Sequence, residues 1–514
     1  MEKELAIQLR GITKRFGTVL ANDHVDLDVY RGEILAVLGE NGSGKTTLMN
    51  MIAGIYYPDE GQILIDGREV VIRSPKDAFE HKIGMVHQHF KLVDLFTAAE
   101  NIVLGMEKEG RYNIREVNTE VGKITEHYGF HLDPTKKIYD LSVSEKQTVE
   151  IIKVLYRGAD ILILDEPTAV LTPQEITRLF SVLHRMKDDG KSIIIITHKL
   201  NEVLEVSDRV AILRRGRHID TVETKDTSEA ELTEMMVGKK IDLNIERSDP
   251  VNPVPRLTVE GLNLYNSDGF HVLRDISFTA NSGEILGVAG IAGSGQRQLL
   301  ETIAGLYDPA SGSIIFHSPR DGKEIDLKDK TPLEIRQLGV SLGFVPEDRL
   351  GMGLVGNMDI TDNVMLRSYR NGIFGFLDRK RPRKQAEEIV RKLEVSTPGL
   401  STPVRRLSGG NVQKVLVGRE ISSSPEVLMT AYPVRGLDIN SSYTIYNLMN
   451  SQKQGGAAVI FVGEDLDVLL ALCDRILVIN GGAVTGIVDA RNITKEEVGL
   501  LMTKTDTERK EEVQ

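Results

Sequence analysis

The sequence predicts an α/β protein made of two tandem copies of one phosphate-binding domain. Three observations support this prediction: a long internal repeat, an alternation of short apolar runs with segments of helical spacing, and a glycine-rich loop at a strand-to-helix turn. A chain of 514 residues is also long enough for two large domains.

The repeat becomes visible when the sequence is aligned with itself. The run RGEILAVLGENGSGKTTLMNMIAGIYYPDEGQI, which begins at Arg31, is matched by SGEILGVAGIAGSGQRQLLETIAGLYDPASGSI, which begins at Ser282. In this alignment Lys45 corresponds to Gln296, 251 positions later. A match of this length indicates two homologous domains.

A second match sets the offset for the later part of each copy. LSVSEKQ, from Leu141, corresponds to LSGGNVQ, from Leu407, at an offset of 266 residues. Between the copies, charged residues and three prolines suit a short extended linker. The predicted organisation is a first domain at 1–240, a linker at 241–256, a second domain at 257–505 and a charged tail at 506–514.

The first copy shows the alternation expected of a largely parallel sheet. The strand-like runs ILAVL, IGMVH, DILILD and SIIIIT are separated by segments with helical spacing. SIIIIT is apolar almost throughout, as expected for a strand that is covered on both faces. Between Lys91 and Asp140 a charged, helix-permissive sequence replaces the strand pattern, which predicts an inserted helical subdomain.

The glycine-rich loop is GENGSGKTT, and it matches the phosphate-binding pattern GxxxxGK[ST] between the strand-like run EILAVL and the helix-like run TLMNMIAGI. Glycines let successive N–H groups curl around phosphate oxygens at a helix N-terminus. Lys45 adds a cation for the outer phosphates, and the Thr46 hydroxyl can ligate Mg²⁺. The predicted nucleotide contacts in this loop are Gly39, Asn41, Gly42, Ser43, Gly44, Lys45, Thr46 and Thr47.

Composition limits the choice of partners. The net charge of −12 gives no general attraction to nucleic acid, so no nucleic-acid partner is expected. The single cysteine, Cys473, excludes an internal disulfide framework and is expected to serve in packing. The N-terminal segment MEKELAIQLRG contains no apolar core of signal-peptide length, and no stretch approaches the roughly 20 apolar residues of a membrane-spanning helix. Membrane attachment is therefore expected only through a partner.

Two further motifs narrow the class of nucleotide-binding protein. LSGGN, from Leu407, and ILILDEPTAVL, from Ile161, occur in an order that resembles the ATP-binding cassette proteins over nearly the whole chain. This resemblance implies two P-loop ATPase domains, each with a mostly parallel sheet, an antiparallel β subdomain and a helical subdomain. It also implies ATP and Mg²⁺ as cofactors.

The resemblance assigns roles to five residues outside the loop. Asp165 holds Mg²⁺ through its water shell, with Thr46 and Gln88 completing the metal contacts, and Glu166 polarises the attacking water. Gln88 also senses the γ-phosphate and links to a membrane partner. His198 contacts the γ-phosphate, and Phe16 stacks on adenine.

Each of these assignments has a structural alternative. His198 could cap a helix, and Phe16 could be a core residue. His87 and His89 flank Gln88 as a metal-binding pair does, although no further ligands are spaced around them.

In the family, two cassettes close head to tail, so that each ATP lies between one phosphate loop and the signature helix of the other cassette. The first site would thus combine Lys45, Glu166 and their neighbours with residues of the second copy. These second-copy residues are Ser408, Gly409, Gly410 and Asp438. Because every part is present, this site is predicted to hydrolyse ATP.

The second site is predicted to be inactive, because it lacks the reacting groups of the first. Its loop loses the ammonium and the Mg²⁺ hydroxyl, its acidic pair is gone, and its signature carries side chains where glycines belong. The differing residues are Gln296, Arg297, Ala431, Tyr432, Glu464 and Glu347, together with Val143 and Ser144 of the opposing signature.

Tandem cassettes with a degenerate second half resemble the energising subunit of bacterial importers for sugars and nucleosides. The resemblance implies two integral-membrane permease subunits, an extracellular substrate-binding lipoprotein and a peripheral position on the cytoplasmic side of the cell membrane. The segment IGMVHQHF and the loop ending GSGQ favour the nucleoside branch, and ribose or galactose importers are the alternative.

Two other classes of protein share the motif order. Soluble tandem-cassette translation factors usually keep both catalytic glutamates and have a long charged linker, whereas Tyr432 replaces one glutamate here and the linker is short. An ATP-binding scaffold without turnover is disfavoured by the presence of Glu166 and His198.

Overall fold

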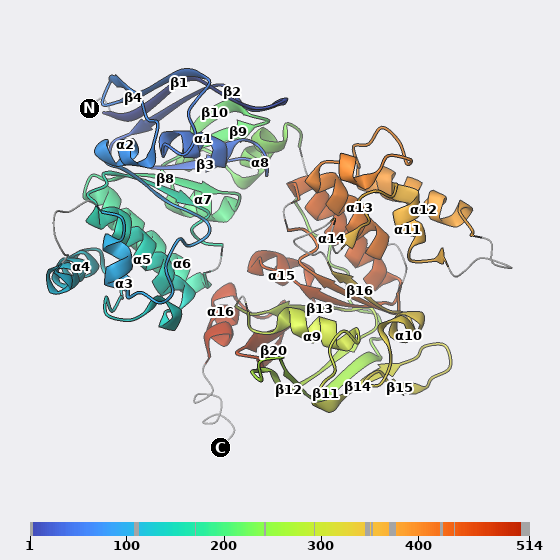
Figure 1. Cartoon of the computed structure of the whole chain (residues 1–514). Coiled ribbons are helices and arrows are strands. Elements are labelled where there is room, and N and C mark those ends of the chain that lie inside the picture. Colours follow the sequence, from blue (N-terminus) through green and yellow to red (C-terminus); the bar gives the residue numbers. More distant parts are fainter. Residues whose placement is uncertain are drawn as a thin grey trace. The chain divides into compact units, whose positions relative to one another are not determined.

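The computed structural model shows two compact units, residues 1–242 and 243–514, which are described separately (Figure 1). Each unit contains one six-stranded and one four-stranded sheet. The structure describes residues 4–106, 113–169, 171–240, 243–291, 293–344, 350, 353–369, 377–421, 425–435 and 437–504.

The larger sheet of the first unit has the strand order β10-β9-β3-β8-β7-β6. All neighbouring strands pair in parallel except the edge strand β10, which is antiparallel to β9. The prediction of a mostly parallel sheet is confirmed. Its strands are β3 (Ile34–Leu38), β6 (Ile83–Val86), β7 (Ile161–Asp165), β8 (Ser192–Thr197), β9 (Arg209–Arg214) and β10 (Arg217–Glu223).

The smaller sheet of the first unit is antiparallel and has the order β2-β1-β4-β5. Figure 1 shows helix α1 between this sheet and the parallel sheet. The strands are β1 (Leu5–Phe16), β2 (Val19–Tyr30), β4 (Glu60–Ile65) and β5 (Arg68–Val70).

The helices of the first unit include two, α3 and α4, in the segment predicted to be a helical subdomain. They pack with α5 around a separate apolar cluster that includes Ile102, Val121 and Val149. The helices are α1 (Lys45–Ile52), α2 (Pro75–Glu80), α3 (Ala98–Val103), α4 (Ile114–Tyr128), α5 (Val143–Tyr156), α6 (Pro173–Asp188), α7 (Leu200–Val206) and α8 (Glu229–Val237).

The central strands are covered on both faces, because alternate side chains of a strand point to opposite sides. Ile194 and Ile196 of β8 join the cluster that contains Met49 of α1. Ile193 and Ile195 join the cluster that contains the helices on the other face. All six residues of β8 are buried, as the apolar run SIIIIT predicts.

The second unit repeats these layers. Its six-stranded sheet has the order β16-β17-β18-β13-β19-β20, and its antiparallel sheet has the order β12-β11-β14-β15. The strands are β11 (Pro255–Tyr265), β12 (His271–Asn281), β13 (Ile285–Ala289), β14 (Ser311–His317), β15 (Glu324–Asp326), β16 (Val340–Phe344), β17 (Val427–Ala431), β18 (Ala458–Val462), β19 (Arg475–Asn480) and β20 (Ala483–Asp489).

The helices of the second unit include several that contact its six-stranded sheet and two, α11 and α12, that pack against each other away from that sheet (Figure 1). The helices are α9 (Gln296–Ile303), α10 (Pro332–Gln337), α11 (Ile360–Met365), α12 (Lys380–Lys392), α13 (Gly409–Ile421), α14 (Ile439–Gln454), α15 (Leu466–Leu472) and α16 (Lys495–Thr503). Cys473, which follows α15, is fully buried in the core, in agreement with a packing role.

The segment predicted as a linker is held against the second unit from residue 243 onward. Lys453 Nζ donates to the Ser248 carbonyl and pairs with Asp474 at 2.8 Å. Arg247 donates to the Leu470 carbonyl at 2.9 Å. Residues 255 and 256 belong to β11. We call residues 244–250 the strap.

In the part of the chain that the structure describes, no helix is long and apolar enough to cross a membrane. Two predicted features lie outside the described residues: Glu347 and the charged tail at 506–514.

Candidate functional site

The phosphate loop joins the carboxyl end of β3 to the start of α1. Gly42 and Gly44 have φ values of 80° and 98°, which side chains disfavour. A Cβ atom on Gly39 would lie 2.3 Å from the Leu213 carbonyl oxygen and 2.5 Å from Ser43 Oγ. The glycines at these positions are therefore required by the backbone and its packing, as the motif predicts.

Two polar groups of this loop are buried and can form further hydrogen bonds. Lys45 is 6% exposed, and its ammonium donates to the carbonyl oxygens of Gly39 and Glu40 at 2.6 and 3.1 Å. Ser43 Oγ is buried and has no hydrogen-bond partner among the described residues. An anion seated in the loop would supply acceptors to both groups, so this cradle fits a phosphate group.

Three predicted catalytic residues come together beyond the carboxyl ends of neighbouring strands. Glu166 follows β7, His198 follows β8 and Gln88 follows β6. His198 Nδ1 lies 2.9 Å from Glu166 Oε1, and Gln88 Nε2 donates to Glu166 Oε2 at 3.0 Å. His198 and Gln88 thus orient the two carboxylate oxygens of Glu166. From the sequence, the three residues were assigned to one site only by resemblance to the family.

The electrostatics of the acidic pair favour a cation. Burial, together with the charge of Glu166, raises the pKa of Asp165 to about 6. For Glu166, burial acts to raise the pKa, but the hydrogen bond from His198 and nearby positive charge outweigh it, and the pKa is lowered. Burial lowers the pKa of Lys45 against the opposing effect of these carboxylates. A divalent cation beside Asp165 would relieve the crowding of negative charge, so the residues fit Mg²⁺.

The remaining loop residues lie at the surface. Thr46 and Asn41 are exposed and Thr47 is half-buried, so that they remain accessible to a ligand. Their roles as nucleotide and metal contacts stay predictions.

Phe16 is 43% exposed and lies at the end of β1, which excludes its reading as a core residue. Its ring meets the ring of Tyr56 edge-on at 5.2 Å, and the Lys14 ammonium lies 5.7 Å from its centre. An exposed, braced ring can stack on a base.

The alternative readings of the histidines find no support. The N-cap of α7 is Lys199, without a side-chain cap bond, so His198 does not cap that helix. Among the described residues, no group of three or more His, Cys, Asp or Glu side chains could hold a metal ion.

The second phosphate loop keeps its shape and loses its charge. Gln296 is 3% exposed, and its amide donates to the Ile291 carbonyl at 3.0 Å, the counterpart of the bond from Lys45 to Glu40. Arg297 replaces the Thr46 hydroxyl and pairs with Glu301 at 2.8 Å.

The second unit has no acidic pair at the end of β17 and forms an Arg–Glu ion pair nearby. Ala431 and Tyr432 stand where Asp165 and Glu166 stand in the first unit. Glu464, the counterpart of His198, pairs with Arg435 at 3.4 Å. No carboxylate–imidazole pair like that of the first unit is formed by these residues.

The two signature helices differ in charge at their starts, a feature that sequence reasoning missed. In the first unit, Ser142 and Glu145 form a capping box before α5, so that a carboxylate lies at the helix start. In the second unit, Asn411 takes the place of Glu145, and its amide donates to Ser408 Oγ at 2.8 Å. The capping pattern S-x-x-E could have revealed the difference from sequence.

The glycines at the start of α13 are accessible, since Gly409 is exposed and a Cβ on Gly410 would meet nothing within 4 Å. Asp438 is the N-cap of α14, where its carboxylate accepts from the Ser441 backbone at 2.8 Å. Lys414 lies 3.5 Å from the same carboxylate. Asp438 thus has a structural task in addition to its predicted nucleotide contact.

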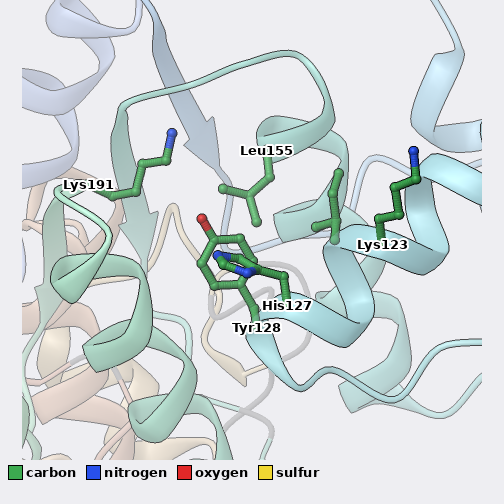
Figure 2. Close-up of a pocket in the computed structure, with 6 residues that line it drawn as sticks. Lys123, His127, Tyr128, Leu155 and Lys191 are labelled. Carbon is green, nitrogen blue, oxygen red and sulfur yellow. The ribbon is translucent and has the colours of Figure 1, made fainter.

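A pocket of about 510 Å³ in the first unit is a separate candidate (Figure 2). Lys123, His127 and Lys191 surround Tyr128 there. Each of these three side chains already lies beside an acid: Lys123 beside Glu120, His127 beside Asp189, and Lys191 beside Asp160. Lys191 precedes the amino end of β8, whereas the nucleotide loop and His198 follow the carboxyl ends of their strands. This pocket therefore lies toward the amino ends of the strands, away from the candidate nucleotide site.

Comparison with known proteins identifies relatives of the whole chain. Residues 22–169 and 273–431 match the family described as ABC transporter, and together they cover more than half of the chain. The nucleoside import ATP-binding protein NupA of Lactococcus lactis is 42% identical over 98% of this chain and 99% of its own length. The guanosine import ATP-binding protein NupO of Bacillus subtilis is also 42% identical, over 97% of each chain.

A sugar importer component and a solved structure match as well. The ribose import ATP-binding protein RbsA 1 of Rubrobacter xylanophilus is 39% identical over 97% of this chain and 98% of its own length. The archaeal ribosome recycling factor aABCE1, solved in complex with the ribosomal stalk protein aP1, gives a TM-score of 0.60 over 94% of this chain and 90% of that chain. At 17% identity this likeness concerns the fold alone.

Proposed function

The chain belongs to the ABC transporter family, and from this premise we propose that it is the ATP-hydrolysing subunit of a nucleoside importer. Two relatives at 42% identity over nearly the full length are named for nucleoside or guanosine import. The observation that carries the hydrolytic part of the proposal is the contact of Glu166 with both His198 and Gln88 in the first unit.

We assign the phosphate groups of ATP to the loop that begins at Gly39. The unpartnered Ser43 hydroxyl and the buried Lys45 ammonium supply donors to the phosphate oxygens. Thr46 and Asp165, with Gln88, would hold Mg²⁺, which supplies charge neutralisation between the phosphates. Phe16 provides the stacking surface for the adenine.

In this proposal Glu166 orients the attacking water and accepts its proton. Its lowered pKa keeps the carboxylate ionised at neutral pH, so that it can accept a hydrogen bond from the water. His198 fixes the carboxylate and presents its other ring nitrogen toward the γ-phosphate. Positioning and charge stabilisation provide most of the rate in phosphoryl transfer to water.

We further propose that Ser408, Gly409, Gly410 and Asp438 of the second unit contact nucleotide. A helix start without an acidic side chain favours a phosphate group. Asn411 keeps the start of α13 neutral, whereas Glu145 places a carboxylate at the start of α5. This difference in charge favours a phosphate contact at the start of α13 over one at the start of α5.

The proposed partners are two integral-membrane permeases, and through them an extracellular substrate-binding lipoprotein, with the chain on the cytoplasmic face of the membrane. Just after Gln88, the apolar residues Val93, Leu95 and Phe96 are 38%, 73% and 39% exposed. Exposed apolar groups close together are typical of a protein contact. We assign this segment to the permease side of the first unit.

The cargo is tested with the assembled transporter, because no residue of this chain is proposed to contact it. ATP hydrolysis by the complex in vesicles should rise when its receptor is loaded with guanosine or another nucleoside. Stimulation by ribose or galactose, and not by nucleosides, would favour a sugar importer instead. The similarity to a ribose import ATP-binding protein is the observation that supports this alternative. Activity that depends on ribosomes and on no permease would overturn both.

A further inference from the structure

A group of three polar side chains behind the reacting residues joins the turn after β7 to the start of α7. Thr168 Oγ1 donates to Glu202 Oε2 at 2.5 Å. Lys199 Nζ donates to Glu202 Oε1 at 2.9 Å and reaches the Thr168 carbonyl at 3.4 Å. The two oxygens of Glu202 thus bind two segments that are more than 30 residues apart in the sequence.

Two members of this group, Thr168 and Glu202, lie in the interior, whereas Lys199 is half-buried. Thr168 is 3% exposed and Glu202 is 9% exposed. Placing a carboxylate there has a desolvation cost that apolar side chains of similar size would avoid. The arrangement therefore calls for a reason other than stability.

Its position supplies that reason. Thr168 lies two residues after Glu166, and Lys199 directly follows His198. The backbone N–H of Glu166 donates to the Ile196 carbonyl at 2.8 Å, which fixes the turn to β8 at one point. The bridge through Glu202 fixes it at a second point, on the far side of the contact between Glu166 and His198.

The second unit builds the same elements without the bridge. Its corresponding residues are Val434, Asp465 and Val468, and both valines pack against the apolar core. The helix α15 and the strand β17 form as α7 and β7 do. The fold therefore tolerates a valine pair at this place, and the polar bridge is present only in the unit with the carboxylate–imidazole pair.

A neighbouring hydrogen bond is retained in both units. Gln147 donates to the Pro167 carbonyl at 2.5 Å, and Gln413 donates to the Pro433 carbonyl at 3.1 Å. The link from the signature helix to this turn is common to both units, so loss of the bridge is not part of a general loss of polar contacts.

We propose that Thr168, Lys199 and Glu202 are positioning residues that hold His198 against Glu166 during ATP hydrolysis, with Glu202 as the central acceptor. The inference rests on the proposed catalytic role of Glu166. A misplacement of a reacting group by about 1 Å can lower a rate by roughly 100-fold. The bridge therefore acts on turnover and not on nucleotide affinity.

The test compares variants of the full chain by kcat, by the KM for ATP and by thermal unfolding. The variant Thr168→Val/Glu202→Val copies the packing of the second unit. It is expected to lower kcat by about 10- to 100-fold, with KM within about twofold and an unfolding temperature close to that of the unaltered chain. Thr168→Ser keeps the hydroxyl and should keep kcat within about threefold of the starting value.

Val434→Thr in the second unit is the matched control and should leave kcat unchanged. Equal kcat values for the double variant and the unaltered chain would overturn the inference. So would a fall in kcat that follows the unfolding temperature, or that Thr168→Ser fails to avoid. Glu166→Gln separates the two levels of the argument: an active Glu166→Gln protein contradicts the proposed function, whereas an inactive one beside a fully active double variant contradicts only the bridge.

Discussion

The phosphate loops of the two units share a backbone and differ in their chemistry. Gly44 and Gly295 have φ values of 98° and 101°, and each precedes an eight-residue helix. The side chain that follows is an ammonium in Lys45 and an amide in Gln296, yet both turn back onto the carbonyls of their own loop. The shape of the loop therefore does not depend on the charge that a phosphate requires.

The turns beyond the central strands teach the same lesson. Glu166 and Tyr432 have φ values of 48° and 52°, a conformation that residues other than glycine rarely adopt. Each backbone N–H donates to the neighbouring strand, to the carbonyls of Ile196 and Val462. The strained turn persists in the unit that has no acidic pair, so sheet pairing maintains it and the catalytic side chain does not.

The largest expected difference between the two units is the effect on kcat of replacing Glu166 and its counterpart Tyr432. Glu166→Gln removes the proposed base and should lower kcat by roughly 10²- to 10⁴-fold while ATP stays bound. Phosphate release and nucleotide retention in the full chain measure the two effects. Tyr432→Ala, the matched change in the second unit, should leave turnover within about twofold. A collapse of activity in that control would show that the second unit contributes to the reaction.

A second contrast concerns stability. Lys453 pairs with Asp474 beneath the strap and has a side chain that is 1% exposed, whereas Lys187 pairs with Asp208 with a side chain that is 28% exposed. Lys453→Met should lower the free energy of unfolding of the second unit by about 3–5 kcal/mol, because it removes the close cation from the buried Asp474 carboxylate and leaves Arg491, 3.9 Å away, as its longer ion-pair contact.

Lys187→Met is the control and should cost the first unit less than about 1 kcal/mol. Unfolding in urea, monitored separately in each unit by hydrogen exchange, measures both changes in free energy. Protection of the strap amides should be lost in the Lys453 variant. Equal destabilisation by the two variants would mean that the strap does not make the Lys453–Asp474 pair more important for stability than the exposed Lys187–Asp208 pair.

The charge of the loop is tested by making the first loop resemble the second. Lys45→Gln should weaken ATP binding by about 10- to 100-fold, which corresponds to the loss of a hydrogen bond from a charged group. Titration with a fluorescent ATP analogue gives the affinity. Gln296→Ala should have no effect on this affinity, and an equal effect there would show that the titration reports the second loop.

The smallest expected effect is at the signature helices. Asn411→Glu gives α13 the acidic start that α5 has, and like charges near a phosphate should lower kcat/KM by about five- to tenfold. Steady-state hydrolysis at low ionic strength measures the change, because salt screens it. Glu145→Gln in the first unit should not lower activity. If both variants behave alike, the proposed phosphate contact of Ser408 is wrong.

Local patterns in the sequence were sufficient for the architecture. The repeat predicts two copies of one fold, and the apolar runs coincide with β3, β6, β7 and β8. These features are local, because a strand that is covered on both faces needs apolar residues at every position. The phosphate loop was equally readable, since its glycines answer to steric limits within a few residues.

Interactions between distant segments were not readable in this way. The sequence placed Gln88, Glu166 and His198 in a common site by resemblance, but their contacts depend on three strands lying side by side. The capping carboxylate of Glu145 was overlooked, although its pattern was present. The strap was expected to be part of a short extended linker, and it is held by a buried lysine that lies more than 200 residues away.

The amino-acid sequence by itself thus determined the duplicated α/β fold, the phosphate cradle and the side chains missing from the second copy. Only the tertiary structure decided which groups orient Glu166, how Glu202 ties its turn to α7, and where the strap is fixed. The physical reason is the range of the forces involved. Steric limits and apolar periodicity act along neighbouring residues, whereas hydrogen bonds between buried polar groups exist only after folding brings their partners together.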